Sequence, residues 1–228
     1  MFLELRNIFS NFFSAFLILI FNQKCVCCNC AKTEKFLCKT CLKDVHYLSS
    51  FAHKIHNNIP IFSATIYDKT VKKLIHKLKF QHKKQASVAL AELLFNYFKN
   101  LELSNNKDLI IIYPSSNTYK SSYRGYEHMY LICNEFKKLS GLELKKNLIK
   151  KIKYTKPQHK ATNKFKNIEN SFKINYKNEK ELAQLREKPI LLIDDIITSG
   201  ATIQEIIKEL NNVGINKIFV LTISKAGV

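Results

Sequence analysis

The segment at residues 189–223 constrains the fold of this chain more than any other part of the sequence. It reads as a strand, a helix and a second strand. Both strands are continuous apolar runs, which is typical of parallel sheets covered on both faces. The alternation of strand and helix predicts an α/β fold class, a parallel sheet flanked by helices. The expected elements are a strand at 189–193, a helix at 202–210 with Gly214 as its stop, and a strand at 217–223.

The preceding part of the chain supports the same fold class. A β-type stretch at 59–67 and a short apolar run at 109–113 read as two further strands. Apolar residues recur with helical spacing after Asp68, which predicts a helix there. Further helices are expected at 86–98 and at about 125–139, with Gly141 as the stop of the latter.

The turn at 193–202 carries the clearest chemistry of the sequence. Two adjacent carboxylates, Asp194 and Asp195, end the apolar strand, and a loop of small hydroxyl residues and Gly200 opens the next helix. Loop amides and a helix N-terminus form a site for a phosphate. Because carboxylates beside a phosphate site would repel the phosphate itself, they fit best as acceptors for sugar hydroxyls, directly or through Mg²⁺. The turn therefore predicts a phosphorylated sugar as ligand.

Six of the seven cysteines lie between residues 25 and 41. A CxxC pair places two thiolates on one tight turn, and two such turns supply a closed tetrahedral Zn²⁺ site. The second pair is Cys38 and Cys41. For the first pair the sequence favours Cys27 and Cys30, with Cys25 and Cys28 as the alternative. A closed site of this kind is expected to stabilise the module and to perform no chemistry.

The N-terminal stretch has an apolar run from Phe12 to Phe21, roughly half of what a bilayer span needs. No small-x-small cleavage site follows it, so a secretory signal is disfavoured. We interpret residues 1–24 as a helix that packs against the rest of the chain, with a membrane anchor as the alternative. The expected organisation is an N-terminal helix and four-cysteine zinc module at 1–50 and a second domain at 51–228, in a cytoplasmic protein.

The charge balance points to polyanionic partners. The chain has 37 Lys and Arg against 18 Asp and Glu, a formal net charge of +19. Residues 137–188 hold 16 Lys and Arg and 5 Asp and Glu, a net +11, with little periodicity. We interpret this segment as a mobile basic connection with a helix near 161–170 and a strand near 172–176. Nucleic acid or phosphate contact and a merely solvated basic surface are both compatible with this charge.

Residues 191–202, Leu-Leu-Ile-Asp-Asp-Ile-Ile-Thr-Ser-Gly-Ala-Thr, resemble the phosphoribosyl pyrophosphate (PRPP) signature of type I phosphoribosyltransferases. The resemblance implies that Asp194 and Asp195 address the ribose hydroxyls, with Mg²⁺ accompanying PRPP. It also implies a loop for the 5′-phosphate, made of Thr198, Ser199, Gly200, Ala201 and Thr202. Arg124 follows a predicted strand and loop, and its guanidinium is expected to reach the pyrophosphate, with a surface salt bridge as the alternative role. We assign no catalytic role to His76, His82, His128 or His159.

Nearly the whole chain resembles the ComF-type competence proteins, which place a CxxC…CxxC module before a phosphoribosyltransferase-like domain. Four segments carry this resemblance: Tyr67 with 74–80, 113–114 with 123–126, Gln158 with 167–172, and 222–226. Lys stands at several positions where these proteins have Arg. The resemblance implies a role in natural transformation, in handling single-stranded DNA in the cytoplasm, with other DNA-uptake proteins as further partners.

Two functions remain open from the sequence. The first is DNA uptake with PRPP and single-stranded DNA as ligands. The second is a phosphoribosyltransferase that transfers phosphoribosyl from PRPP to a nitrogenous acceptor in nucleotide metabolism. For the first function, lysines in the least periodic part of the basic segment are expected to contact DNA phosphates. These are Lys150, Lys151, Lys153, Lys156 and Lys160.

Overall fold

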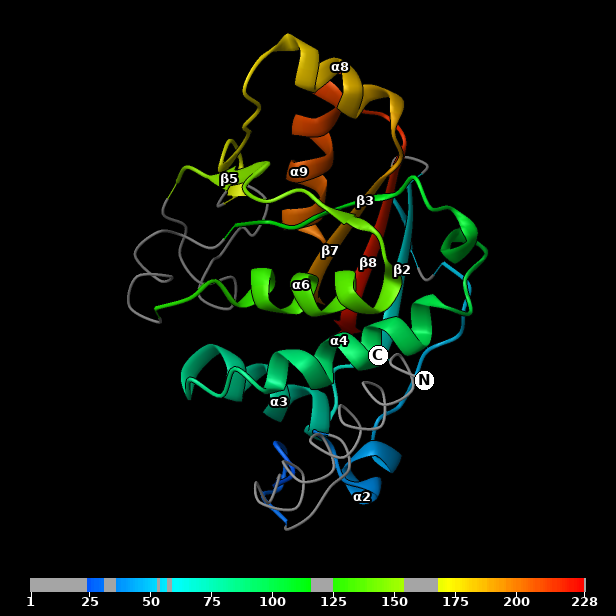
Figure 1. The fold of residues 1–228 in the computed structure, drawn as a ribbon, viewed down its shortest axis with the longest axis vertical. Helices are drawn as coiled ribbons and strands as arrows, with labels where there is room; N and C mark the ends of the chain where they lie inside the picture. Colours follow the sequence, from blue (N-terminus) through cyan, green and yellow to red (C-terminus); the bar gives the residue numbers. More distant parts are fainter. Residues whose placement is uncertain are drawn as a thin grey trace, which may run out of the picture.

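The structure is a computed structural model that describes residues 24–30, 36–52, 54–56, 59–115, 125–153 and 168–227 (Figure 1). The helices are α2 Lys39–Lys43, α3 Lys69–Phe80, α4 Ala86–Phe98, α6 His128–Ser140, α8 Glu179–Glu187 and α9 Ala201–Asn212, with a short 3-10 helix at Glu102–Asn105. The strands are β1 Lys54–His56, β2 Ile59–Ile66, β3 Ile110–Ile112, β4 Glu143–Leu144, β5 Ile149–Lys151, β6 Phe172–Ile174, β7 Ile190–Ile197 and β8 Ile218–Lys225.

The main sheet has the strand order β1-β2-β8-β7-β3-β4. The five strands from β2 to β4 in this order are parallel, and β1 pairs antiparallel with β2 at one edge. The predicted fold class, a parallel sheet flanked by helices, is therefore confirmed. β7 and β8 pair along most of their length, from Ile190 beside Ile218 to Ile197 beside Lys225. The predicted β-α-β unit at 189–223 thus supplies two central strands.

Each face of the sheet is covered by its own set of helices. The helices α3, α4 and α6 pack on one face, where the buried core includes Leu90, Ile132 and Leu191. The helices α8 and α9 and the β5–β6 pair pack on the other face, where the core includes Ile206 and Leu192. In Figure 1, α4 and α6 cross in front of the sheet, and α3 and the cysteine segment lie below them. Adjacent apolar residues of β7 face opposite cores, which is why its sequence is continuously apolar.

Helices α3 and α6 form where the sequence predicts them because their ends are specified locally. The side chain of Asp68 accepts a hydrogen bond from the amide of Val71, 3.1 Å away, and caps α3. α6 ends at Gly141, whose φ of +75° is in the left-handed region that favours glycine. The predicted bounds of α4, 86–98, agree with the structure.

The basic segment is more ordered than its composition indicated. Among its described residues, β4, β5, β6 and α8 are regular elements, and only the strand near 172–176 was predicted. β5 and β6 pair antiparallel, which places Ile149 opposite Ile174. The interpretation of 137–188 as a mobile connection is therefore wrong for this described part. The helix predicted at 161–170 lies mostly outside the described residues, as does the N-terminal helix at 1–24.

The described cysteine segment shares a core with the following elements. Val26, Leu37, Cys41 and Val45 belong to the same buried cluster as α3 and α4. Short β-bridge contacts continue the connection, since Tyr47 pairs with Thr65 of β2. One continuous hydrophobic core therefore contains residues from both sides of the expected domain boundary at residue 50. In the part of the chain that is described, no helix is long and apolar enough to cross a membrane.

Candidate functional site

The acidic pair lies within β7, which runs two residues beyond it to Ile197. Asp194 is still in register with Thr222 of β8, so the sheet itself fixes the backbone of the pair. Gly200 then has a φ of +78°, a left-handed conformation that lets the chain turn directly into α9. The loop between strand and helix is only three residues long, from 198 to 200. This places two carboxylates and a helix N-terminus at the same end of the sheet.

Asp195 is a buried carboxylate with two basic neighbours. Its side chain is 11% exposed, and Oδ2 forms an ion pair with Lys79 of α3. Nε2 of His128, at the start of α6, lies 3.0 Å from the same oxygen. Burial opposes ionisation of Asp195, but the charge of Lys79 and the His128 hydrogen bond outweigh it and hold the pKa of this carboxyl well below its usual range. Asp195 is therefore ionised at neutral pH.

Asp194 has the opposite behaviour. Burial and the negative charge of Asp195 raise the pKa of Asp194 to about 7. Its Oδ1 accepts a hydrogen bond from the backbone amide of Asp195, 2.9 Å away, which partly offsets this effect. The charges of Lys79 and Lys151 also favour ionisation of Asp194. The two carboxylates therefore differ, because Asp195 is ionised at neutral pH whereas the pKa of Asp194 is raised to about 7.

The predicted phosphate loop comprises residues 198–200 and the first two residues of α9, Ala201 and Thr202. Thr198 is exposed, Ser199 and Thr202 are half-buried, and Gly200 and Ala201 are buried. The structure thus brings the sequence-predicted residues 194–202 together in one turn. The helix N-terminus and these hydroxyls can bind a phosphate, while the carboxylates can accept hydrogen bonds from sugar hydroxyls.

Sequence reasoning missed Lys79 and His128 as members of this site. Both reach Asp195 from the helices α3 and α6, which cover one face of the sheet. A signal for Lys79 existed, because it lies in one of the segments that resemble ComF-type proteins. His128 had no such signal, because it lies outside the four segments that resemble ComF-type proteins. Only the tertiary structure shows that Lys79 and His128 contact Asp195.

Arg124 lies outside the described residues, so its predicted contact with pyrophosphate stays a prediction. The described residues that follow it are anchored to α3. The hydroxyl of Tyr126 donates a hydrogen bond to the carbonyl of Leu78, and its ring meets His82 edge-on with centroids 6.1 Å apart. The amino group of Lys84 lies 5.3 Å from the centre of the same ring. The chain after Arg124 therefore begins α6 from a fixed point beside the C-terminal end of α3.

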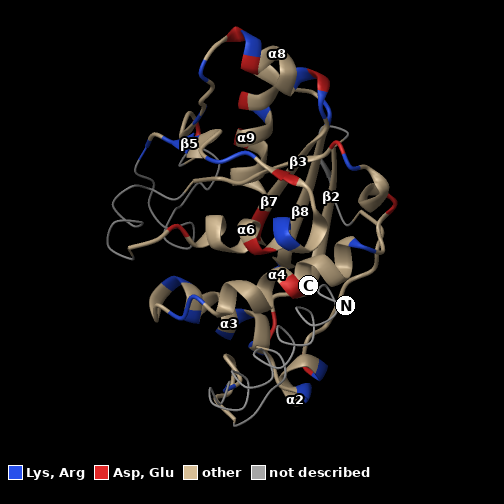
Figure 2. Ribbon diagram, viewed as in Figure 1, with Lys and Arg blue, Asp and Glu red and all other residues tan. Residues whose placement is uncertain are grey.

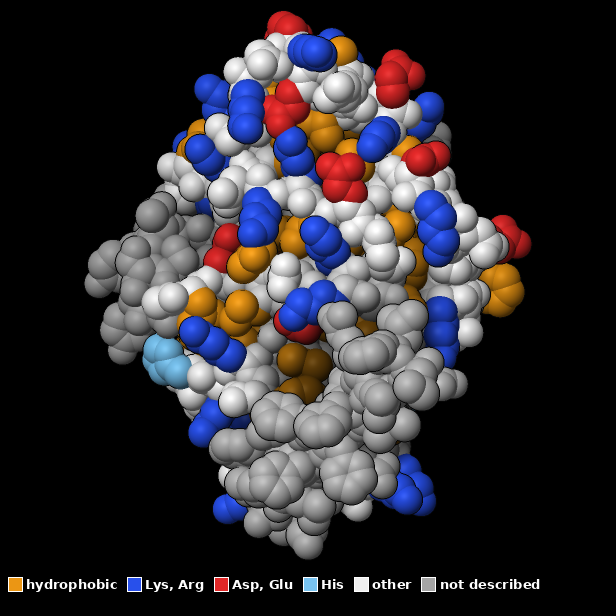
Figure 3. Space-filling view, in the orientation of Figure 1, with side chains coloured by type: hydrophobic (Ala, Val, Ile, Leu, Met, Phe, Trp, Pro, Cys, Tyr) orange, Lys and Arg blue, Asp and Glu red, His pale blue; other side chains and the backbone are white. Residues whose placement is uncertain are grey.

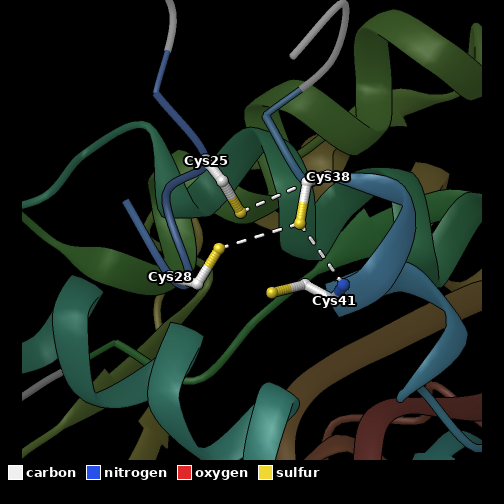
Figure 4. Close-up of side chains that lie close together, drawn as sticks. All are labelled: Cys25, Cys28, Cys38 and Cys41. Carbon is white, nitrogen blue, oxygen red and sulfur yellow. Dashed lines mark hydrogen bonds between the residues drawn. The ribbon is translucent and has the colours of Figure 1, made fainter. Parts of the chain in front are cut away.

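Four cysteines form a second candidate site, a metal centre. The sulfur atoms of Cys25, Cys28, Cys38 and Cys41 all lie within 4.8 Å of one another (Figure 4). Four sulfurs from two turns are the donor set of a structural tetrahedral zinc site. The predicted pair Cys38 and Cys41 is part of the group. The first pair is the alternative, Cys25 and Cys28, in place of the favoured Cys27 and Cys30.

The local backbone explains why Cys25 and Cys28 belong to this group. Residues 26–28 form a tight turn, closed by a hydrogen bond from the amide of Asn29 to the carbonyl of Cys25 at 2.8 Å. Cys25 and Cys28 stand at the two ends of the turn, and both direct their sulfurs toward the second pair (Figure 4). Cys27, inside the turn, is buried in the core instead. The sequence pattern allowed either spacing, and the turn selects one.

Three of the four sulfur atoms, those of Cys25, Cys28 and Cys38, also accept hydrogen bonds from backbone amides. The amide of Cys38 lies 3.4 Å from Sγ of Cys25, and the amide of Cys41 lies 3.4 Å from Sγ of Cys38. The amide of Cys30 donates to the Cys28 thiol and lowers its pKa to about 6. N–H donors stabilise the negative charge that a thiolate brings to a metal. The donor set therefore fits Zn²⁺.

Helix α3 holds the first cysteine turn in place. Lys77 is 7% exposed, and its Nζ donates hydrogen bonds to the carbonyls of Val26, at 2.7 Å, and Cys27, at 2.9 Å. Asn29 Oδ1 lies 3.4 Å from the same nitrogen. A buried ammonium group needs such acceptors to compensate for lost hydration. Lys77 thus satisfies carbonyls of the first cysteine turn, while Lys79 on the same helix contacts Asp195.

The lysines predicted to contact DNA are only partly described. Lys150 and Lys153 are exposed, and Lys153 Nζ donates to the carbonyl of Glu169 at 3.1 Å. Lys151 Nζ lies 5.5 Å from the ring centre of Phe172, and its charge acts on Asp194. Lys156 and Lys160 lie outside the described residues. Figure 3 shows Lys and Arg side chains spread over the viewed face, with fewer acidic ones between them.

The chain is similar in sequence to a known domain family and to two kinds of characterised protein. Residues 130–226 match the phosphoribosyl transferase domain family, a range that includes the acidic pair and its loop. The chain is 25% identical over 213 residues to competence protein F of Haemophilus influenzae, covering 88% of this chain and 90% of that protein. It is 23% identical over 189 residues to the DNA utilization protein YhgH of Escherichia coli strain K12, covering 79% of this chain and 80% of that protein.

Proposed function

Because this chain is a ComF-family protein with a phosphoribosyl transferase domain, we propose that it supports DNA uptake in natural transformation. In this role it binds PRPP with Mg²⁺ at the turn 194–202 and contacts single-stranded DNA with its basic surface. The names of two relatives, competence protein F and DNA utilization protein YhgH, support a function that involves DNA. Other DNA-uptake proteins are its further partners, and its work takes place in the cytoplasm.

One observation carries the PRPP part of the proposal. Two carboxylates near the end of β7 are separated by only two residues from a hydroxyl loop that leads into the N-terminus of α9. In this arrangement, Thr198, Ser199 and Thr202 hold the 5′-phosphate, and Asp194 and Asp195 accept hydrogen bonds from the ribose hydroxyls. Mg²⁺ bound with PRPP would supply positive charge that offsets the charge of the pyrophosphate. Lys79 and His128 keep Asp195 ionised for this task.

Single-stranded DNA is the second ligand. The formal charge of +19 favours a polyanion, and the lysines at 150, 151, 153, 156 and 160 are our proposed phosphate contacts. Zn²⁺ at Cys25, Cys28, Cys38 and Cys41 has a structural role in this proposal. When bound, it links the two cysteine turns that pack against α3.

The alternative function is transfer of phosphoribosyl from PRPP to a nitrogenous acceptor. It uses the same turn, since displacement of pyrophosphate depends mainly on positioning and charge neutralisation. The two functions differ in turnover. A fold and a ligand site do not by themselves establish a reaction.

Calorimetry with PRPP and Mg²⁺ tests the proposal. We expect the wild type to bind PRPP, and we expect the double variant Asp194→Asn, Asp195→Asn to bind it more weakly. A suitable control is Asp108→Asn, since Asp108 is exposed and lies in the loop before β3, away from the candidate site. Unchanged affinity in the double variant would remove the PRPP site. Pyrophosphate release from the wild type with free nucleobases would favour the transferase alternative.

A further inference from the structure

We propose that one face of α3 is a binding surface for single-stranded DNA that leads to the Asp194–Asp195 turn. The surface, which we call the α3 stripe, consists of Lys69, Lys72, Lys73, His76 and Phe80. This inference rests on the proposed function and gives it a location beyond the lysines at 150–160. All five residues of the stripe belong to the part of the chain that the structure describes, unlike Lys156 and Lys160.

Helical spacing places the stripe on a single face. Each member stands three or four residues from at least one other member along α3, so together they form one face of the helix surface. The opposite face is buried, with Val71, Leu74 and Leu78 in the core. At a rise of about 1.5 Å per residue, the stripe is about 16 Å long. It is therefore a continuous surface rather than a scatter of single charges.

The stripe borders a groove that reaches the candidate PRPP site. The groove has a volume of about 750 Å³, and the whole stripe contributes to its lining. Tyr67, Ile196 and Lys79 line the same groove. Ile196 follows Asp195 directly in β7, and Lys79 forms the ion pair with Asp195. A strand that follows the stripe can thus bring its terminal nucleotide to the acidic pair.

The chemistry of the stripe fits unpaired nucleotides. α3 has no acidic residue between Lys69 and Phe80. Asp68, which caps the helix, already accepts a hydrogen bond from the amide of Val71, and its Oδ2 lies 3.0 Å from Nδ1 of His46. Phe80 is 62% exposed, and its ring lies 5.0 Å from that of His76, centroid to centroid. Lysines beside an exposed aromatic ring are typical of surfaces that neutralise phosphates and stack bases. Bases inside a duplex cannot stack in this way, so the fitting partner is a single strand. Figure 2 shows the basic positions on α3 and on the turn after it.

The chain has no tryptophan, which allows a direct test. The variant Phe80→Trp introduces a single fluorophore at the end of the stripe. We expect oligothymidylate to quench its emission, because a base stacks on the indole. The matched control is Phe51→Trp, since Phe51 is 81% exposed and lies outside the stripe. We expect much weaker quenching there.

A second measurement tests the charges. The double variant Lys72→Gln, Lys73→Gln should bind oligothymidylate about tenfold more weakly at low salt. The slope of log affinity against log salt should become less steep by about 1.4. Each phosphate contact with a single strand contributes about 0.7 to the steepness of this slope, and the variant removes two lysines. The control Lys180→Gln, Lys208→Gln removes the same charge from α8 and α9, on the other face of the sheet. PRPP binding should be the same in both variants, which verifies that they are folded.

The outcomes separate this inference from the proposed function. If the wild type binds no DNA even at low salt, both the stripe and the DNA part of the proposed function are overturned. If the wild type binds DNA but the α3 variant binds it as tightly as the control variant does, only the stripe is overturned. Binding of the stripe to anionic phospholipid vesicles but not to oligothymidylate would also overturn it.

Discussion

Lys79 of α3 and Asp195 of β7 form an ion pair at the point where the helix layer meets the end of the sheet. The carboxylate oxygen of this pair is also the one that His128 contacts. A ligand hydroxyl that binds Asp195 must therefore share this oxygen with two cationic or polar groups or use the other oxygen. The pair keeps the carboxylate charged in a buried position, and the following experiment measures how much it contributes.

Replacement of Lys79 by Met keeps most of the side-chain volume but removes the charge. We expect it to lower the free energy of unfolding by about 2 kcal/mol, because it leaves Asp195 buried without its ion-pair partner. Urea denaturation at pH 7 measures the change. Lys72→Met on the exposed side of α3 is the control and should change stability by less than about 0.5 kcal/mol. Equal stability of the two variants would show that the ion pair does not stabilise the fold.

Asp194 makes stability depend on pH. Its pKa is about 7 in the folded protein and 3.8 in the reference state, so the folded state favours the protonated form. The stability gained in this way is complete below pH ~4 and is lost as the pH rises through about 7. Asp194→Asn does not titrate, so its stability relative to the wild type should increase from pH 5 to pH 8. Because Asp194 is half-buried, we expect an increase of the order of 1 kcal/mol.

Thermal unfolding at several pH values checks this expectation. Asp195 does not interfere in this range, because its pKa is lowered and its contribution is lost only as the pH falls below its usual value of 3.8. A constant difference between Asp194→Asn and the wild type from pH 5 to pH 8 would contradict a raised pKa.

The metal ligands can be distinguished by two serine substitutions in the same turn. Cys28→Ser should lose zinc, because its sulfur belongs to the group of four. Cys30→Ser should keep about one zinc ion per chain. Both cysteines are exposed, so the two variants disturb packing to a similar extent. Metal analysis of the purified proteins decides between them, and zinc loss in Cys30→Ser alone would restore the pair that the sequence favoured.

Lys77 provides a test of the contact between α3 and the cysteine segment. Lys77→Met leaves the carbonyls of Val26 and Cys27 without their buried donor. We expect the free energy of unfolding to fall by about 2 kcal/mol, since hydrogen bonds from charged groups contribute about 1.5–3 kcal/mol. Urea denaturation of the zinc-loaded protein measures it, with Lys73→Met as the exposed control on the same helix. A change no larger than that of the control would mean that the contact contributes little.

The elements that could be predicted are those that local sequence patterns determine. α4 at Ala86–Phe98 has helical apolar periodicity, and the unit from Ile190 to Asn212 combines an apolar strand with a helix followed by Gly214, so their types and approximate bounds followed directly. α8 was missed because its helix is short and mostly polar, with only Leu182 and Leu185 buried. Its cap, Asn178, is the local signal that was overlooked.

The candidate site was predictable only as far as it is contiguous. Residues 194–202 form one turn, so their arrangement followed from the motif. Lys79 and His128 are brought to Asp195 by the packing of α3 and α6 on the sheet, and no local pattern encodes that meeting. The choice between Cys25/Cys28 and Cys27/Cys30 likewise depended on a turn geometry that two overlapping CxxC spacings left open.

The position of β8 has a consequence for how the protein forms during synthesis. Among the described strands β8 is the last to be made, yet it lies between β2 and β7, and Thr222 contacts Ser63 at 2.8 Å between hydroxyl oxygens. While the ribosome is still elongating the chain, β2 and β7 have no common neighbour, and their edges stay open to other partners. The cysteine turns and α3 emerge much earlier and can assemble first. The acidic pair gains its neighbouring strand only when translation has passed residue 225.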